Sequence, residues 1–193
     1  MNQAAERKGS YRIVFSGHRI DAPGRTTPRF PASGEPVAAR LIANALRTEV
    51  AANDTARLEG IASGANGGDI LFLEACAAQG VPATIYLALP KDEFVAASVA
   101  DGGEDWVRRF ERLCETMPVH VLEHDENSPL NVYQQTNLWM LERALAHNSA
   151  GVTVMVLWDG ASGDGAGGTR DMVQRASEAG ARVIRLDTSK LQE

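Results

Sequence analysis

Three glycine-rich stretches hold most of the residues in this sequence that are suited to binding an anion. They read SGHR at 16–19, SGANGGD at 63–69 and DGASGDGAGGTR at 159–170. Glycine lets the backbone approach a bound group closely, and the free N–H groups at the start of a following helix attract a phosphate or a carboxylate. The stretches therefore favour a ligand that carries phosphate, although any tight turn also needs a glycine.

Each stretch comes directly after a run of residues typical of a buried strand. β-Branched and apolar runs predict strands at 11–15, 58–62, 83–89, 119–123, 152–158 and 182–186. Apolar residues at helical spacing predict helices at 35–52, 69–79, 92–117, 129–148 and 169–179. Asp101-Gly102-Gly103 should divide the third helix in two. We expect Ser128 to cap the fourth helix and Pro129 to be its first residue.

The regular alternation of strands and helices predicts the fold class. It is typical of a Rossmann-like, doubly wound α/β fold with a mainly parallel sheet of about six strands and helices on both faces. The apolar runs at 83–89 and 152–158 suit strands that are covered on both faces, which places them near the middle of the sheet. Such sheets bind ligands at the carboxyl ends of their strands, near a topological switch point. The three glycine stretches should meet there.

Composition narrows the range of partners. The 193 residues include 25 Asp and Glu against 19 Lys and Arg, giving a net charge of -6. This length suits one folded domain at 11–187, between a flexible N-terminus at 1–10 and a C-terminal tail at 188–193. The acidic balance argues against a long nucleic acid. The lack of an 18-residue apolar run and of an apolar leader argues against a membrane protein and against export, so we expect a cytoplasmic location.

Two common nucleotide-binding motifs are missing. No Gly-Lys-Ser/Thr follows the glycines, which argues against a Walker A loop, and no G-x-G-x-x-G follows the first strand, which argues against an NAD dehydrogenase. Cys76 and Cys114 lack the spacing of metal ligands. We therefore expect no metal and no required cofactor, and a nucleotide or a phosphate-sugar as the ligand.

Three segments together resemble the SLOG superfamily of Rossmann-like nucleotide-binding domains. They are SGHR at 16–19, GIASGANGGDILFLEACAAQG at 60–80 and GGTRDMVQRASEAG at 167–180. The second is similar to the bacterial DNA-processing branch of that group, and SGHR is similar to the T-G-S-R turn of its stand-alone branch. The group also includes the lysine decarboxylase-like, cytokinin-activating phosphoribohydrolases. The resemblance implies nucleotide binding and makes a homodimer possible.

One departure from this group concerns a catalytic carboxylate. The last loop of the phosphoribohydrolases reads P-G-G-x-G-T-x-x-E, and alignment on Gly168-Thr169 puts Met172 where they have Glu. The nearest carboxylate is one residue away. N-glycosidic hydrolysis is therefore a weaker prediction than binding. The candidate catalytic residues are Asp69, Glu74, Asp159 and Asp171.

Three polar side chains allow two interpretations each. Asp69 could cap the helix that it starts or bind a ribose hydroxyl or a base. Glu74, in an apolar helix, could face solvent or pair with a cation such as Arg19 inside the site. His18 could act as an acid or base, or only bond the backbone.

A further pair lies at the start of the helix predicted at 129–148. Tyr133 and Asn137 are four residues apart and share a face, so they could read a base or a sugar or could only be solvated. Asp159, at the end of a strand, could reach a ligand hydroxyl. Enlarging Gly67 and Gly68 should block ligand binding and leave the fold largely intact.

The predicted ligand-binding residues come from the three glycine stretches and from this helix. They are Ser16, Gly17, His18, Arg19, Ser63, Gly64, Ala65, Gly67, Gly68, Asp69, Tyr133, Asn137, Asp159, Gly167, Gly168, Thr169 and Arg170. The leading hypothesis is a nucleotide sensor that binds without catalysis. One alternative is a nucleotide N-glycosidase, phosphoribohydrolase-like or deoxyribosyltransferase-like. Another is a protein interaction module without a small ligand.

Overall fold

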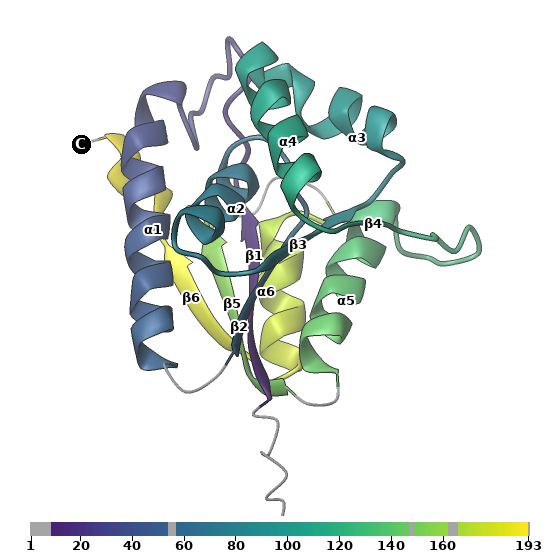
Figure 1. Ribbon diagram of the computed structural model, residues 1–193. Coiled ribbons are helices and arrows are strands. Elements are labelled where there is room, and N and C mark those ends of the chain that lie inside the picture. The colour runs from purple at the N-terminus through teal and green to yellow at the C-terminus, as the bar shows by residue number, and fades with distance from the viewer. Residues whose placement is uncertain (1–8, 54–56, 147–148, 162–165, 193) are drawn as a thin grey trace, which may run out of the picture.

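The computed structural model describes residues 9–53, 57–146, 149–161 and 166–192 (Figure 1). Most of the N-terminus predicted to be flexible (1–10) lies outside these residues. So do residues 162–165 of the third glycine stretch and the end of the helix predicted at 129–148.

Within the described residues, six parallel strands form one sheet in the order β4-β3-β2-β1-β5-β6. The strands are β1 (Ser10–Gly17), β2 (Arg57–Ala62), β3 (Ala83–Leu87), β4 (Val119–Val121), β5 (Ser149–Leu157) and β6 (Arg182–Leu186). Together with helices on both faces, this order confirms the predicted Rossmann-like, doubly wound fold. The centre of the sheet is β1 and β2, and β3 and β5 lie directly beside them, so the prediction that placed 83–89 and 152–158 near the middle is confirmed.

Helices cover both faces of the sheet. They are α1 (Glu35–Ala52), α2 (Gly68–Ala78), α3 (Lys91–Ser98), α4 (Glu104–Thr116), α5 (Val132–Leu145) and α6 (Thr169–Glu178), with short 3-10 turns η1 (Ala32–Gly34), η2 (Ala100–Gly102) and η3 (Thr188–Gln192). Figure 1 shows α1 and α2 on one side of the strands and α6 and α5 on the other. The predicted division of the third helix is confirmed, because η2 separates α3 from α4.

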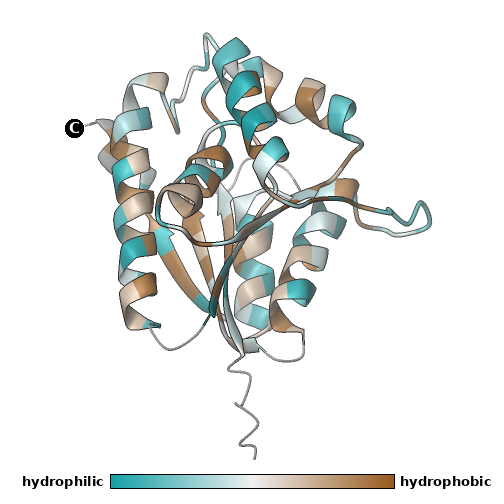
Figure 2. Cartoon of the chain, in the orientation of Figure 1, coloured by the Kyte–Doolittle hydropathy of each residue, from teal (hydrophilic) through white to brown (hydrophobic). Residues whose placement is uncertain are grey.

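The core follows from the alternation of side chains along each strand. Ile13 and Phe15 of β1 point to the layer of α1 and α2, and Phe15 stacks on Phe72 with ring centroids 4.8 Å apart. Val14, between them, packs with the layer of α5 and α6. Figure 2 shows the hydrophobic residues gathered on the strands, while α1 and α4 alternate between hydrophilic and hydrophobic residues. Both faces of the sheet are therefore buried, as a parallel sheet requires.

The start of α5 differs from the prediction. The helix begins at Val132 rather than at Pro129, and its cap is Asn131 rather than Ser128. The Asn131 side chain accepts from the Gln134 N–H at 2.9 Å, and the Gln134 side chain accepts from the Asn131 N–H at 3.2 Å. This reciprocal capping box satisfies two backbone donors at once, which the Ser128-Pro129 pair cannot do.

The segment predicted as a C-terminal tail forms η3. Its Leu191 is only 3% exposed and packs against Gly34 of η1, where a Cβ atom would lie 2.9 Å from the Leu191 Cβ. The last described residues thus help to fix the connection between β1 and α1.

The strand order creates a topological switch point between β1 and β5. These two strands pair in parallel from Ser10–Ser149 to Gly17–Leu157. After β1 the chain passes through α1 to β2 on one side, and after β5 it passes through α6 to β6 on the other. Connections that leave in opposite directions open a crevice at the carboxyl ends of the two strands, where ligands bind in folds of this class.

Candidate functional site

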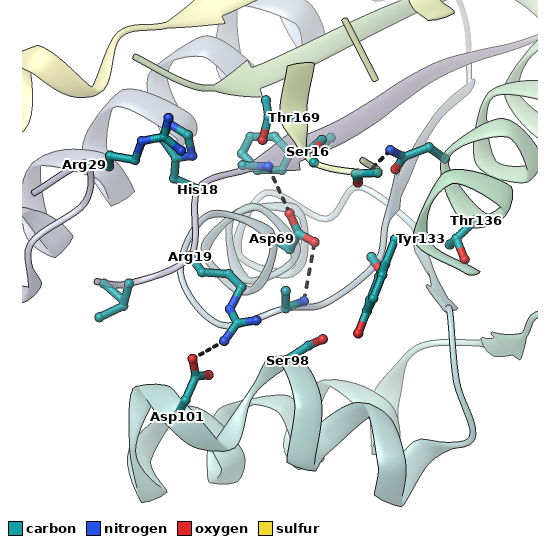
Figure 3. A pocket seen from close by; sticks show the side chains of 18 of the residues that line it. Ser16, His18, Arg19, Arg29, Asp69, Ser98, Asp101, Tyr133, Thr136 and Thr169 are labelled. Atoms are coloured by element: carbon teal, nitrogen blue, oxygen red, sulfur yellow. Dashed lines mark hydrogen bonds and ion pairs between the residues drawn. The ribbon is translucent and has the colours of Figure 1, made fainter. Parts of the chain in front are cut away.

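A cavity of about 460 Å³ lies at this switch point (Figure 3). Its walls come from the loops after β1, β2 and β5, from the first three turns of α5, and from the α3–η2 segment. Its size suits a small organic ligand.

Most of the predicted ligand-binding residues line this cavity. They are Ser16, Gly17, His18, Arg19, Ser63, Ala65, Asp69, Tyr133, Asn137, Gly167, Gly168 and Thr169. The predicted residues that do not line it are Gly64, Gly67, Gly68, Asp159 and Arg170. Of the four candidate catalytic carboxylates, only Asp69 is part of the cavity wall.

The Asp69 side chain accepts hydrogen bonds from backbone N–H groups of the first two glycine loops. Its Oδ1 accepts from the Gly17 N–H at 3.2 Å, and its Oδ2 accepts from the N–H groups of Gly64 and Ala65 at 3.2 and 3.4 Å. The carboxylate therefore occupies the position that the amides of the first two loops would offer to a phosphate. The amides of Gly17 and Gly64, predicted as phosphate donors, are already satisfied by the protein itself.

The same bonds join two loops that are far apart in the sequence. Asp69 is 6% exposed, and burial raises its pKa to about 7 against the lowering effect of the three N–H groups and of Arg19. Neither helix capping nor ligand binding alone describes this residue. It is a buried residue that joins the first two loops, and one side of it lines the cavity.

Gly67 and Gly68 serve a close backbone contact. Gly67 has φ +84, and a Cβ atom there would lie 2.7 Å from the His18 carbonyl oxygen and 2.8 Å from the Ile20 nitrogen. The Gly68 N–H donates to the His18 carbonyl at 3.0 Å. Both glycines let the second loop pack on the first loop. The expectation that enlarging them would leave the fold intact was therefore wrong.

The third glycine loop has its closing contacts on the other side, with α5. The Asn137 amide donates to the Gly167 carbonyl at 2.9 Å, and the Asn131 amide donates to the Ala166 carbonyl at 2.9 Å. Both bonds use loop carbonyls, not loop amides. The first-turn N–H groups of a helix have no acceptor within the helix, and here the residues of that turn, Gly168 and Thr169, line the cavity.

Asp171 holds α6 to α5. Its Oδ2 accepts from Asn137 at 3.0 Å and from the Arg175 Nε at 2.9 Å, and its Oδ1 accepts from Gln134 at 3.5 Å. Burial opposes ionisation, but these bonds hold the pKa of Asp171 below its usual range. Asp171 is therefore a clamp between two helices rather than a group that faces a ligand.

Arg19 is held against the α3–η2 segment. Its guanidinium donates to the Ala97 carbonyl at 3.1 Å and pairs with Asp101. Asn66, fully buried, binds the same Asp101 through its amide nitrogen at 2.7 Å and accepts from the Ile20 N–H at 3.1 Å. This network ties the first two loops to η2, so the predicted phosphate ligand Arg19 has a second role in positioning a cavity wall.

The side chains of Arg29 and His18 contact Asp159 just after the carboxyl end of β5. The Arg29 Nε lies 3.1 Å from the Asp159 Oδ2, and the His18 Nε2 lies 3.3 Å from the Asp159 Oδ1. Burial opposes ionisation, but the Ala161 N–H, His18 and Arg29 lower the pKa of Asp159. The His18 Nε2 also accepts from the Asp159 N–H at 3.3 Å, so the predicted backbone bond of His18 is present.

Glu74 lies outside the cavity. Arg109 of α4 donates to both of its oxygens, at 2.8 and 2.7 Å. Both interpretations hold in part, since the Glu74 side chain is 36% exposed and also pairs with a cation, but that cation is not Arg19, because α4 packs on α2 and brings its own arginine to that face. This bidentate pair joins two helices.

Tyr133 is the most exposed of the side chains predicted to bind the ligand from α5, at 37%. In Figure 3 it projects across the cavity from the side opposite Arg19, with Asp69 between them. A phenol ring in this position offers a surface on which a planar ring can stack.

Several wall residues carry no motif that sequence reasoning could have used. They are Ile20, Asp21, Ala22, Phe94, Ser98, Asp101, Thr136 and Met140. Arg25 and Arg29 also line the cavity, and the only signal for them was arginine close to a glycine turn. The Asp21 side chain accepts from the N–H groups of Arg29 and Phe30 at 2.9 Å each and so shapes this loop.

Two further properties concern the described residues as a whole. Within them, no group of three or more His, Cys, Asp or Glu side chains is arranged to hold a metal ion. None of the helices in these ranges combines the length and the apolar character that crossing a membrane needs.

No protein-family model matches the chain, and no curated protein matches its sequence. Among solved structures, the chain is similar to the X-ray structure of TM1055, a target of the Northeast Structural Genomics Consortium. The two are 12% identical, the match covers 93% of this chain and 94% of the other, and the TM-score is 0.39.

Proposed function

We propose that this protein binds a nucleotide or a nucleotide derivative in the cavity at the β1–β5 switch point, as a SLOG-type sensor domain. The observation that carries the proposal is the meeting of three features in one cavity. The first turn of α6 supplies amides, Tyr133 supplies an exposed aromatic ring, and the guanidinium groups of Arg19, Arg25 and Arg29, each of which also pairs with an Asp side chain, line the wall.

Each feature suits one part of a nucleotide. Helix N-termini and arginines favour phosphate, the latter through a fork of N–H donors. The phosphate would lie at Gly168 and Thr169, because the amides of the second loop are taken by Asp69. The base and sugar would extend along Tyr133 towards Ser98.

The test is a binding screen with the full chain. Ligands released from purified protein on denaturation are identified by mass spectrometry, and thermal unfolding is followed with nucleoside monophosphates, NAD and ADP-ribose. A ligand at one hundred times its Kd should raise stability by about 2.7 kcal/mol and Tm by roughly 5–10 °C. The absence of a shift across the panel would contradict the proposal and favour an interaction module.

A second candidate, N-glycosidic cleavage, is favoured by one observation about Asp69. It is a buried carboxyl on the cavity wall with a pKa of about 7, which is suited to giving and taking protons at neutral pH. The measurement is release of free base from the same nucleotides, followed by chromatography. Binding without release of free base would support the sensor and contradict the N-glycosidase.

A further inference from the structure

The balance of charge around Asp69 has a consequence for any anion that enters the cavity. Asp69 is held by backbone N–H groups, and no ion pair with it is formed by the residues that the structure describes. Arg19, the cation that acts on it, is itself paired with Asp101 and bonded to the Ala97 carbonyl. The negative charge of Asp69 therefore lacks a counter-charge of its own.

The charged and titratable groups around Asp69 come from several elements. The loop after β1 supplies His18, Arg19, Asp21, Arg25 and Arg29, η2 supplies Asp101, and α5 supplies Tyr133. Loop amides and the first turn of α6 complete the surroundings. Arg19 favours the charged carboxylate of Asp69, and its partner Asp101 carries the opposite charge.

The cavity is small enough for a ligand charge to act on Asp69. A sphere of about 460 Å³ would be about 10 Å across, which is the length over which 0.1 M salt screens exposed charges. Within a partly buried cavity the screening is weaker still. A phosphate at Thr169 and the carboxylate at Asp69 share this space.

We propose that the anion of the ligand and the negative charge of Asp69 exclude each other, so that the site takes up its ligand together with one proton on Asp69. This inference rests on the proposed function. The proton comes from the buffer and binds one carboxylate oxygen, and no other bond is made or broken. The resulting O–H group can donate a hydrogen bond, where the carboxylate could only accept.

The direction of the pH effect follows from the same residue. Burial raises the pKa of Asp69 to about 7, so near neutral pH Asp69 exchanges between its protonated and charged forms. A neighbouring anion raises this pKa further, and binding at pH 7 should take up a fraction of a proton. Affinity should be highest below pH 7 and should fall as pH rises, with a limiting slope of tenfold per unit.

The experiment is calorimetric titration of the full chain with AMP at pH 7.0 in buffers of different ionisation enthalpy, which gives the number of protons taken up. Affinity is then measured from pH 7.5 to 9, where the phosphate of AMP, with a second pKa of about 6, is already a dianion. Sulfate, which does not titrate in this range, serves as a second probe. Two variants are compared with the wild type. Asp69→Asn removes the carboxyl group that should take up the proton, and His18→Gln removes the other side chain of the cavity wall that sequence analysis named as an acid or base.

The expected result, expressed per mole of AMP bound, is uptake in the wild type and in His18→Gln and no uptake in Asp69→Asn; the affinity of His18→Gln is not part of the comparison, because His18 lines the cavity. If Asp69→Asn does not fold, uptake that is equal in wild type and His18→Gln supports the inference. Binding of AMP without proton uptake overturns the inference and leaves nucleotide binding intact. Uptake that is lost in His18→Gln also overturns it. No binding of AMP or sulfate to the wild type, even at pH 6, overturns this inference, and no binding of any nucleotide of the panel overturns nucleotide binding as well.

Discussion

The second and third glycine loops look alike in sequence and do different things in the structure. SGANGGD is closed by its own Asp69, and Gly67 packs on the backbone of the loop after β1. AGGTR, at 166–170, is fixed through its carbonyls by α5, and the first turn of α6 faces the cavity. A glycine-rich turn before a helix can thus be a packing device or an anion site. The role of such a turn depends on whether a side chain of the protein already accepts hydrogen bonds from its backbone N–H groups.

The largest effect is expected from Gly67→Val. The new side chain would meet the His18 carbonyl and the Ile20 nitrogen at φ +84, so unfolding free energy should fall by roughly 3–5 kcal/mol. Urea denaturation measures this change. The control is Gly80→Ala, at φ +67 with nothing within 4 Å, which should cost only about 1 kcal/mol. Equal costs would mean that the second loop is not a packing device.

A smaller loss is expected from Asp69→Ala. Three backbone N–H groups would lose their acceptor, which should lower stability by roughly 2–4 kcal/mol. Formate, a free carboxylate, should raise Tm of this variant more than that of the wild type. Asp105→Ala, an exposed carboxylate in an i,i+3 pair with Arg108, is the control and should cost under about 0.5 kcal/mol. A variant that formate does not stabilise would count against a seat for an anion between the first two loops.

For the third loop, Asn137→Ala should cost about 1–2 kcal/mol and should weaken nucleotide binding at least tenfold. The amide lost here fixes the Gly167 carbonyl and thereby the first turn of α6. Gln79→Ala loses a similar amide bond, to the Ala43 carbonyl at 3.0 Å, far from the cavity. Thermal unfolding and calorimetry on both variants should show a larger stability loss in Asn137→Ala, which also loses the bond to Asp171, and a binding defect only in that variant. A comparable defect in both would remove the special role of the third loop.

The smallest change in stability is expected from Tyr133→Ala, under about 1 kcal/mol, because this ring is more than a third exposed. Its affinity for a nucleotide should nevertheless fall about tenfold or more through lost stacking, and Tyr133→Phe should keep most of it. Calorimetry on the two variants separates the ring from its hydroxyl. Unchanged affinity in Tyr133→Ala would place the base elsewhere in the cavity.

The fold was predictable because strands and helices carry periodic patterns that local physics enforces. The helix at 35–52 and the strand at 182–186 were predicted with their observed bounds. The start of α5 was not, because Ser128-Pro129 and the reciprocal Asn131–Gln134 pair are both plausible beginnings. In the structure the Asn131 side chain also donates a hydrogen bond to the Ala166 carbonyl, 35 positions away, and the local sequence does not show this contact.

The edge of the sheet that holds the site was also predictable, but the role of each residue was not. Glycine and arginine types indicated an anion site near the correct strands. Three of these roles depend on contacts between elements that are remote in the sequence. They are the hydrogen bonds of Asp69 to the first loop, the ion pair of Arg19 with Asp101 and the ion pair of Glu74 with Arg109. The α3–η2 wall, with Phe94 and Ser98, carries no motif at all, so only the folded chain brings it to the cavity.

The central pairing of β1 with β5 has a consequence for the order of assembly during synthesis. Gly17 lies beside Leu157, and the His18 N–H donates to the Leu157 carbonyl at 3.0 Å, although 139 residues separate them. The first four strands and α1 to α4 can pack together while the ribosome is still adding residues. The ligand cavity cannot, because its α6 wall is translated only after β5. Binding competence should therefore appear late, as a slow step governed by long-range closure, and nucleotide added during refolding should stabilise only the finished chain.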